Sequence, residues 1–216
     1  MICSRYWDNG TTADVGAVTW GNGAGGTVGT VMATNSLTGS LANDLTGSTV
    51  TALTNGHYVV GSPNWNNGAG AATWGNGETG GTRLAGTISA NNSLIGSSPG
   101  DGIGTNITAL TNGNFVASSG YWDKVNADNS VVTDAGAVTW CNGDGGTVGT
   151  ASATNSLIGS TKNDYAGSDD AKSNNVTALT NGNYVVSSKY WDNEKAVNAG
   201  AVTWGNSHSW QNREKA

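Results

Sequence analysis

Charged side chains are scarce in this sequence. They make up 11% of the 216 residues, and the nine Lys and Arg residues are scattered, leaving a net charge of −6. Nucleic acids and anionic membranes are recognised by clustered basic side chains, so neither is an expected partner. Long apolar runs are also missing, whereas a membrane span needs about 18 such residues. The first residues lack the apolar segment of a signal peptide, so export would need to be directed by sequence outside this chain.

Residues suited to catalysis are equally rare. The chain holds two histidines and two cysteines. His57 occupies a position where two other copies of a repeat carry Asn, and His208 lies in a non-repeating tail, so both are expected to be incidental. The Cys and His spacing resembles no zinc site, and no nucleophile recurs beside a base. We therefore expect no enzyme activity, no cofactor and no bound metal.

One phrase of sequence is present four times. It reads aromatic-Trp-Asp/Asn, Gly-Ala-Val-Thr-Trp-Gly-Asn, Asn-Ser-Leu, Asp-x-x-Gly and Thr-Ala-Leu-Thr-Asn-Gly-x-aromatic-Val. The Trp in the second part of the phrase recurs at Trp20, Trp74, Trp140 and Trp204. A period of about 60 residues is too long for a helical hairpin repeat and suits a four-stranded blade. The sequence therefore predicts a tandem β-repeat.

The strands are clearest in the third copy of the phrase. Asn112-Gly113 is a strong hairpin signal, because both positions of the turn favour positive φ. The first and second strands are expected on either side of this turn, and the third strand ends at the repeated Trp. A fourth strand of small and β-branched residues follows a glycine-rich turn. The expected ranges are 107–111, 115–118, 136–140 and 147–153.

The predicted fold is all-β, a partial β-propeller of about three and a half four-stranded blades, with a β-solenoid as the alternative. The repeat body covers 1–206, and a non-repeat tail covers 207–216. Repeats one to four are approximately 1–48, 49–104, 105–175 and 176–206. Because the body starts and stops within a unit, we expect a piece of a longer protein. Unpaired terminal strands favour edge-to-edge self-association.

Residues 47–63 resemble a known repeat. They read Gly-x-x-Val-Thr-Ala-Leu-Thr-Asn-Gly-x-Tyr-Val-Val-x-Ser-Pro, which is similar to the FG-GAP repeat of integrin-alpha-type β-propellers. The closer similarity, over residues 2–206, is to tandem repeats of large bacterial surface proteins described as filamentous-haemagglutinin-like, whose function is unassigned. This resemblance implies a secreted or cell-surface location. FG-GAP repeats hold calcium between their first two strands, but the turn here has no carboxylate, so the calcium site is not carried over.

The tryptophans form two sets. Those that end the third strands alternate with Val or Ala, so they are expected to pack between neighbouring blades. The other set lies between the second and third strands, on one face of a propeller. An indole beside Asp or Asn can stack on a sugar ring and hydrogen-bond its hydroxyls, and the alternative is packing against the blade edge. The candidate ligand-binding residues are Trp7, Asp8, Trp65, Asn66, Trp122, Asp123, Trp191 and Asp192.

Other recurring polar residues have a structural interpretation. Asp44, Asp101 and Asp164 each precede a Gly by three residues, and such an Asp commonly accepts N–H bonds within its own loop. Ion binding is the alternative. Asp14 and Asp134, before the third strand, are interpreted in the same way.

The two cysteines are expected to be unpaired. Cys3 is placed at the repeat position of Val60 and Val186, and Cys141 at that of Gly75. A disulfide framework would put cysteines at matching positions, whereas free Cys commonly behaves as a small apolar residue.

These observations predict a non-catalytic structural or adhesive repeat module, extracellular or on the cell surface as part of a longer protein. The alternative is a multivalent carbohydrate-binding module that uses the Trp and Asp residues of the loops. Glycans or other surface proteins are the expected partners.

The clustering of insertions at 125–131 and 168–174, both in loops, fits a repeated unit whose interior cannot absorb extra residues.

Overall fold

The computed structural model describes residues 1–79, 85–169, 173–193 and 195–206. Within them the chain forms short β-strands and a single helical turn, α1 (Trp65–Gly68). The expectation of an all-β fold is confirmed, and none of the small sheets closes into a barrel. No helix in these ranges is both long and apolar enough to cross a membrane.

Each complete repeat folds as an antiparallel meander. In repeat three the sheet order is β15-β13-β10-β9, so the four strands pair in chain order as predicted. The Asn112-Gly113 turn joins the first two strands, and Gly113 has a φ of 88°. The expectation of positive φ at both positions was wrong for Asn112: the Leu110 N–H donates to the Asn114 carbonyl at 2.8 Å, which closes a three-residue loop with only its last residue, Gly113, left-handed, another common hairpin connection. These four strands are β9 (Asn106–Ala109), β10 (Phe115–Ser119), β13 (Ala137–Cys141) and β15 (Leu157–Ile158).

The other repeats use the same strands. Repeat two has all four: β4 (Thr49–Ala52), β5 (Tyr58–Ser62), β6 (Ala71–Gly75) and β8 (Leu94–Ile95). Repeat one has the second to fourth: β1 (Ile2–Ser4), β2 (Ala17–Thr19) and β3 (Ser36–Thr38). The described part of repeat four has the first to third: β16 (Val176–Ala178), β17 (Tyr184–Ser188) and β18 (Ala201–Gly205).

The predicted fourth strand was wrong in position. Residues 147–153 do not pair with the third strand of repeat three; β15 does, through Ala137↔Ile158 and Val138↔Leu157. The Asn-Ser-Leu segment takes this place because its apolar residue packs on the core: Leu37 and Leu94 are fully buried, and Leu157 is partly buried against the third cluster. The hydroxyls of Thr139 and Ser156 also lie 2.7 Å apart across the pair.

The residues that were expected to form the fourth strand cross to the preceding repeat instead. There β14 (Gly149–Thr150) pairs in parallel with β8, and β7 (Gly86–Thr87) pairs in the same way with β3. We call these two segments the reach-back strands. Just after them, Ile88 and Ala151 are almost fully buried, so each reach-back strand delivers one apolar side chain toward the earlier repeat.

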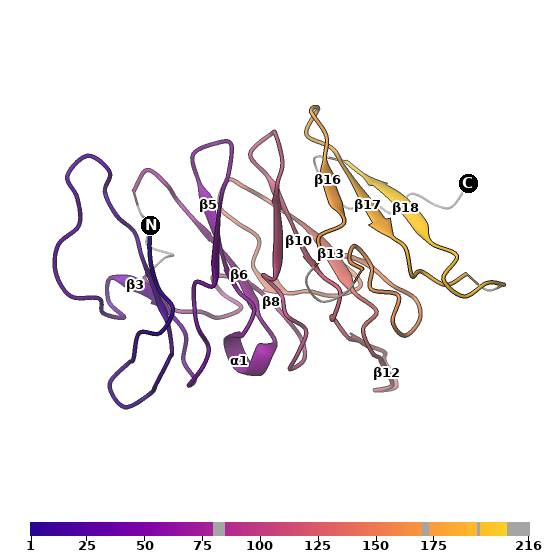
Figure 1. Ribbon diagram of the computed structural model, residues 1–216, viewed down its shortest axis with the longest axis horizontal. Helices are drawn as coiled ribbons and strands as arrows, with labels where there is room; N and C mark the ends of the chain where they lie inside the picture. The colour runs from indigo at the N-terminus through magenta and orange to yellow at the C-terminus, as the bar shows by residue number, and fades with distance from the viewer. Residues whose placement is uncertain (80–84, 170–172, 194, 207–216) are drawn as a thin grey trace.

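The sheets follow one another along the long axis of the molecule from the N-terminal to the C-terminal side (Figure 1). Buried apolar side chains lie between consecutive sheets rather than around one centre, as in other repeat proteins. The first junction is filled by Val18, Leu37, Tyr58, Val60 and Trp65; the second by Val59, Trp74, Leu94, Phe115 and Trp122; the third by Val116, Val138, Val176, Tyr184 and Val186.

The insertion in the second-to-third connection of repeat three forms its own hairpin. Strands β11 (Lys124–Val125) and β12 (Val131–Val132) pair antiparallel. Both strands carry half-exposed valines, Val125 and Val131. The extra residues therefore project from the repeat without changing its sheet.

The position assigned to Cys3 was wrong by one residue. Cys3 lies opposite Val18, whereas Val60 lies opposite Thr73 and Val186 opposite Thr203. A one-residue shift in register moves a side chain to the other face of a sheet, so Cys3 corresponds to Gly61 and Ser187 instead. Cys141 does occupy the position of Gly75, and both cysteines are free, as expected.

The last described sheet exposes apolar residues that other repeats bury. Val202 is 74% exposed, whereas Val138, at the same register position opposite the second strand, is fully buried. Trp204 is 47% exposed, against 8% for Trp74. Self-association of the chain stays a prediction. It was based on unpaired strand edges, and this exposed face is a second, apolar surface that could contribute.

Candidate functional site

The loop tryptophans do not form an exposed ring. Trp65 and Trp122 are only 7% and 3% exposed, each within the core between two repeats. Trp7 and Trp191 are half-buried. An indole enclosed on both faces offers nothing for a sugar ring to stack on. The geometry of the two central repeats therefore supports the packing alternative for this set.

The Asp residues beside these tryptophans close their own loops. Oδ1 of Asp8 accepts a hydrogen bond from the backbone N–H of Asp14 at 2.8 Å. Asp123 accepts one from Asp134 at 2.8 Å, and Asp192 accepts one from Asn198 at 2.6 Å. The three donor residues have φ between 52° and 54°, a left-handed conformation in which Asp and Asn are enriched. These carboxylates thus hold the turn before the third strand.

Repeat two builds the same connection differently. Asn66 and Asn67 have φ of 51° and 57° and lie in α1, and the backbone N–H of Asn66 donates to Asp44 at 2.8 Å. Among the described residues, the Asn66 side chain makes no loop-closing bond equivalent to that of Asp123. Of the eight candidate residues, the structure brings together each Trp with its neighbour in a loop, but it does not gather the four loops into one site.

The recurring aspartates each connect two repeats. Asp44, Asp101 and Asp164 are 0–1% exposed. In each, Oδ2 accepts two consecutive backbone N–H groups of its own loop at 2.7 to 2.9 Å. Oδ1 accepts a backbone N–H from the next repeat, and these three donors are Asn66 at 2.8 Å, Asp123 at 3.0 Å and Asp192 at 3.1 Å. This geometry matches the interpretation that each Asp builds its own loop. The bond to the next repeat was not predicted from the sequence.

The environments of these carboxyls are not identical. Burial raises the pKa of Asp101 above its usual value, in spite of hydrogen bonds from both loops. Burial also raises the pKa of Asp164, but bonds donated by Thr161, Ser160 and the Asp192 N–H outweigh it and leave this pKa below its usual value. Ionised Asp164 therefore stabilises the folded state at pH values above its unfolded-state pKa of about 3.9. This contribution is lost as the pH falls through the lower pKa of the folded state.

Folding is expected to be independent of calcium. Calcium takes six to eight oxygen ligands, and the described ranges hold no group of three or more His, Cys, Asp or Glu side chains placed to bind a metal. Thermal melts with added calcium and with excess chelator should therefore coincide. A midpoint that rises by several degrees with calcium would contradict this, since a bound ion stabilises the folded state by mass action.

Three tyrosines in the loops of repeats three and four lie next to one another. The rings of Tyr121 and Tyr165 have centroids 6.1 Å apart, and those of Tyr165 and Tyr190 are 6.0 Å apart. We call these three residues the tyrosine row. Tyr121 is 42% exposed, and the other two are half-buried. Sequence reasoning missed Tyr121 and Tyr190 because it treated the aromatic-Trp doublet as one element, although Tyr directly precedes Trp in three repeats. It missed Tyr165 because the other repeats have Leu45 and Gly102 at this position after the recurring Asp.

Two grooves lie along the face that carries these loops, the lower edge of the molecule in Figure 1 where α1 and β12 are labelled. The first has a volume of about 620 Å³ and is lined by Pro63, Asn64, Asn67, Gly100 and Tyr121 among others. The second has a volume of about 400 Å³ and is lined by Gly100, Tyr121, Asp123, Asp134 and Tyr165 among others. Gly100 and Tyr121 thus border both.

The second groove is acidic. Burial raises the pKa of Asp134, and the nearby charge of Asp123 raises it further. The positive charge of Lys162 acts in the opposite direction, as does a hydrogen bond with the Tyr165 hydroxyl. Tyr165 and the two carboxyl groups thus border the same groove.

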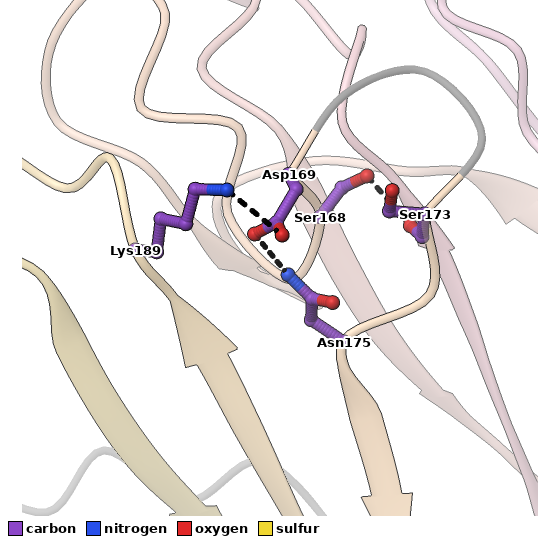
Figure 2. Close-up of polar contacts among 5 residues, drawn as sticks. All are labelled: Ser168, Asp169, Ser173, Asn175 and Lys189. Atoms are coloured by element: carbon purple, nitrogen blue, oxygen red, sulfur yellow. Dashed lines mark hydrogen bonds and ion pairs between the residues drawn. The ribbon is translucent and has the colours of Figure 1, made fainter.

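The far end of the tyrosine row meets the second insertion of repeat three. Figure 2 shows Asp169 between Lys189, whose Nζ lies 3.0 Å from Oδ2, and Asn175, whose Nδ2 donates to Oδ1 at 2.6 Å. The Ser168 hydroxyl donates to the Ser173 carbonyl at 2.6 Å across the base of the same loop. Lys189 also lies 4.7 Å from the ring centroid of Tyr190. Its charge is balanced by Asp169, so it adds no net positive charge here.

The thiol of Cys141 is not placed for chemistry. It is fully buried, and burial raises its pKa to about 12. Because the thiolate is the reactive form of cysteine, such a thiol is inert near neutral pH. It fills the position between repeats two and three at which other copies carry Gly.

Comparison with known proteins identifies a family of repeats. No curated protein sequence shows significant similarity to the chain. The family described as "Repeat of unknown function (DUF5650)" matches at residues 1–48, 52–105, 109–168 and 178–212, four copies that together cover most of the sequence. The chain therefore belongs to this family of tandem repeats, DUF5650.

Proposed function

We propose that this protein is a non-catalytic structural module whose repeats stack in line to form an extended scaffold. The observation that carries the proposal is the position of the three buried aspartates. One of them lies at every junction between consecutive repeats, and each accepts N–H groups from both sides. Hydrogen bonds to a buried carboxylate are about twice as strong as neutral ones, so this arrangement favours a fixed geometry between units.

The opposite face supports the same proposal through its turns. The Thr54 hydroxyl donates to the carbonyl of Leu110 at 3.2 Å, and the Thr111 hydroxyl donates to that of Leu179 at 3.1 Å. The second and third junctions are therefore joined by the same bond. The Thr-Asn-Gly sequence of the turn thus links one repeat to the next as well as forming a hairpin.

Close contact between turns also explains one glycine. A Cβ atom on Gly113 would lie 2.9 Å from Cβ of Asn55 in the preceding repeat, and Gly182 has the same relation to Asn112. Such a distance is shorter than two carbon atoms tolerate. The repeats can therefore stack at this spacing only with Gly in the turn, whose positive φ also favours Gly.

The resemblance to repeats of bacterial surface proteins supports a place for this scaffold outside the cell, within a longer protein. The tryptophan indoles contribute to the stacking, since Trp20 donates to the carbonyl of Gly77 at 3.3 Å and Trp74 to that of Gly143 at 2.8 Å. Both bonds run from one repeat to the next. A surface role of this kind requires rigid spacing and no chemistry.

Insertion of a second copy of residues 49–104 after Gly104 is expected to lengthen the particle by about 10 Å, the usual spacing of stacked sheets. Far-UV circular dichroism per residue should stay the same, and the melting temperature should not fall, because the extra unit gains a neighbour on each side. Small-angle X-ray scattering measures the maximum dimension.

The matched control is a Gly/Ser segment of the same length inserted at the same place. It should add the far-UV circular dichroism signal of a disordered chain and lower the melting temperature. An added repeat that behaves like this control, or that leaves the maximum dimension unchanged, would contradict the scaffold proposal.

A further inference from the structure

The tyrosine row lies outside the three core clusters that fill the junctions between repeats. Tyr121, the residue shared by both grooves, is 42% exposed and belongs to none of the core clusters between repeats. An exposed aromatic ring at the border of two hollows, on a rigid loop, is typical of a surface that binds a ligand.

We propose that this face binds a linear, neutral glycan, with Tyr121 and Tyr165 as stacking platforms and the side chains of Asp123 and Asp134 as hydrogen-bond acceptors for sugar hydroxyls. This binding is an activity beyond the structural role, and it uses tyrosines rather than the buried tryptophans.

The chemistry of the lining favours a sugar over an apolar ligand. A sugar ring has one face of C–H groups and a rim of hydroxyls, so it matches a tyrosine ring beside polar groups. The second groove offers that combination in Tyr121, Tyr165, Thr133 and the two aspartates. The first groove adds Asn64 and Asn67 beside Pro63. Both grooves therefore present aromatic or proline surface together with polar side chains.

The arrangement of the row favours a linear ligand. Its three rings come from two loops of repeat three and one of repeat four, with centroid spacings of 6.1 and 6.0 Å. Neighbouring rings are inclined to each other by 59° and 70°, so they form no single flat platform, and a chain of sugars would stack on one ring and pass the edge of the next. The grooves continue this line toward repeat two, because Tyr121 borders both of them.

The charge of the surface selects against acidic glycans. The second groove holds two carboxylates, Asp123 and Asp134, against the nearby ammonium group of Lys162, and Lys189 is paired with Asp169. The whole chain carries a net charge of −6. Like charges repel at short range, so a uronic acid polymer is disfavoured relative to a neutral one.

The loops that carry Tyr121 and Tyr165 are held in position before a ligand binds. The loop of Tyr121 is fixed by the bond from the Asp123 N–H to Asp101, and Tyr165 directly follows Asp164, which is buried and bonded to the next repeat. The raised pKa of Asp134 reflects the same packed surroundings. A site that needs little ordering on binding loses little of its interaction energy to conformational entropy.

Affinity gel electrophoresis of the full chain tests the proposal with four neutral polysaccharides, namely hydroxyethyl cellulose, laminarin, xylan and galactomannan, and with polygalacturonate as the acidic counterpart. We expect at least one neutral polysaccharide to retard the protein and polygalacturonate to leave it unaffected. Combined Tyr121→Ala and Tyr165→Ala should weaken the interaction by about tenfold or more, since two aromatic contacts are lost.

Tyr6→Ala is the matched control. Tyr6 is 66% exposed and precedes Trp7 as Tyr121 precedes Trp122, but it borders neither groove, so binding should be retained. If the double variant fails to fold by circular dichroism, Tyr121→Ala alone replaces it, because that ring is already exposed.

Absence of retardation by all four neutral polysaccharides would overturn the proposal, as would binding that survives the tyrosine substitutions or that is equally strong with polygalacturonate. The scaffold proposal is tested separately, since loss of glycan binding leaves the length of the particle unchanged. Conversely, a repeat insertion that fails to lengthen the particle does not affect retardation by a glycan.

Discussion

Replacement of Trp122 by Ala is expected to lower the free energy of unfolding by about 3 to 5 kcal/mol. The indole is 3% exposed and packs with Phe115, Trp74 and Leu94 between repeats two and three. Its removal leaves a cavity that the two flanking sheets cannot close without losing their other contacts. Chemical denaturation followed by circular dichroism measures the change.

Two variants serve as controls for this loss. Trp122→Phe should cost clearly less than Trp122→Ala, because it keeps a ring in the core and removes an indole N–H that is buried without a hydrogen bond. Trp204→Ala removes the same side chain from a site that is 47% exposed and should also cost less. Unchanged stability of Trp122→Ala would place this indole at the surface and revive the loop tryptophans as a binding face.

Substitution of Asp101 by Asn is expected to destabilise the protein by about 3 kcal/mol. Oδ2 of Asp101 accepts the backbone N–H groups of Ser97 and Ser98 and the Ser97 hydroxyl. Oδ1 accepts the N–H of Asp123 in the next repeat. An amide has only one oxygen, so one set of donors would face an NH₂ group and lose its acceptor in a buried place.

Asp128→Asn is the control, because it removes a carboxylate that makes no bond between repeats. Asp128 is exposed in the β11–β12 hairpin and accepts hydrogen bonds only from Ser130 within its own turn. Its substitution should leave the free energy of unfolding nearly unchanged, as is usual for surface positions without such links. Equal effects of the two substitutions, measured by denaturant titration, would show that Asp101 does not join the repeats.

The local features of this fold were predictable from the sequence, and the features that depend on a neighbouring repeat were not. Asn112-Gly113 defines a hairpin by turn chemistry alone, and the structure has it with β9 and β10 on either side. The stretch that includes β14 was assigned to its own sheet because small β-branched residues indicate a strand but not its partner. Its pairing with β8 depends on the distance between repeats, which no sequence pattern encodes.

The candidate site shows the same limit. Asp101 was expected to build its loop, and it does, but its bond to the Asp123 N–H becomes visible only when two repeats are side by side. Trp122 and Tyr121 are adjacent in sequence, yet one is buried and the other is exposed. In a loop there is no alternation of faces, so the sequence does not indicate which of the two side chains is exposed.

The reach-back strands have a mechanical consequence. At the junction of repeats two and three, β14 extends from the later repeat onto β8 of the earlier one, while Asp101 in the connection after β8 binds the loop of Tyr121 farther along the chain. Hydrogen bonds therefore cross the junction in both directions along the chain. Tension applied along the chain loads the parallel strand pair and the aspartate bonds together, so neighbouring repeats yield in one step and not one after the other.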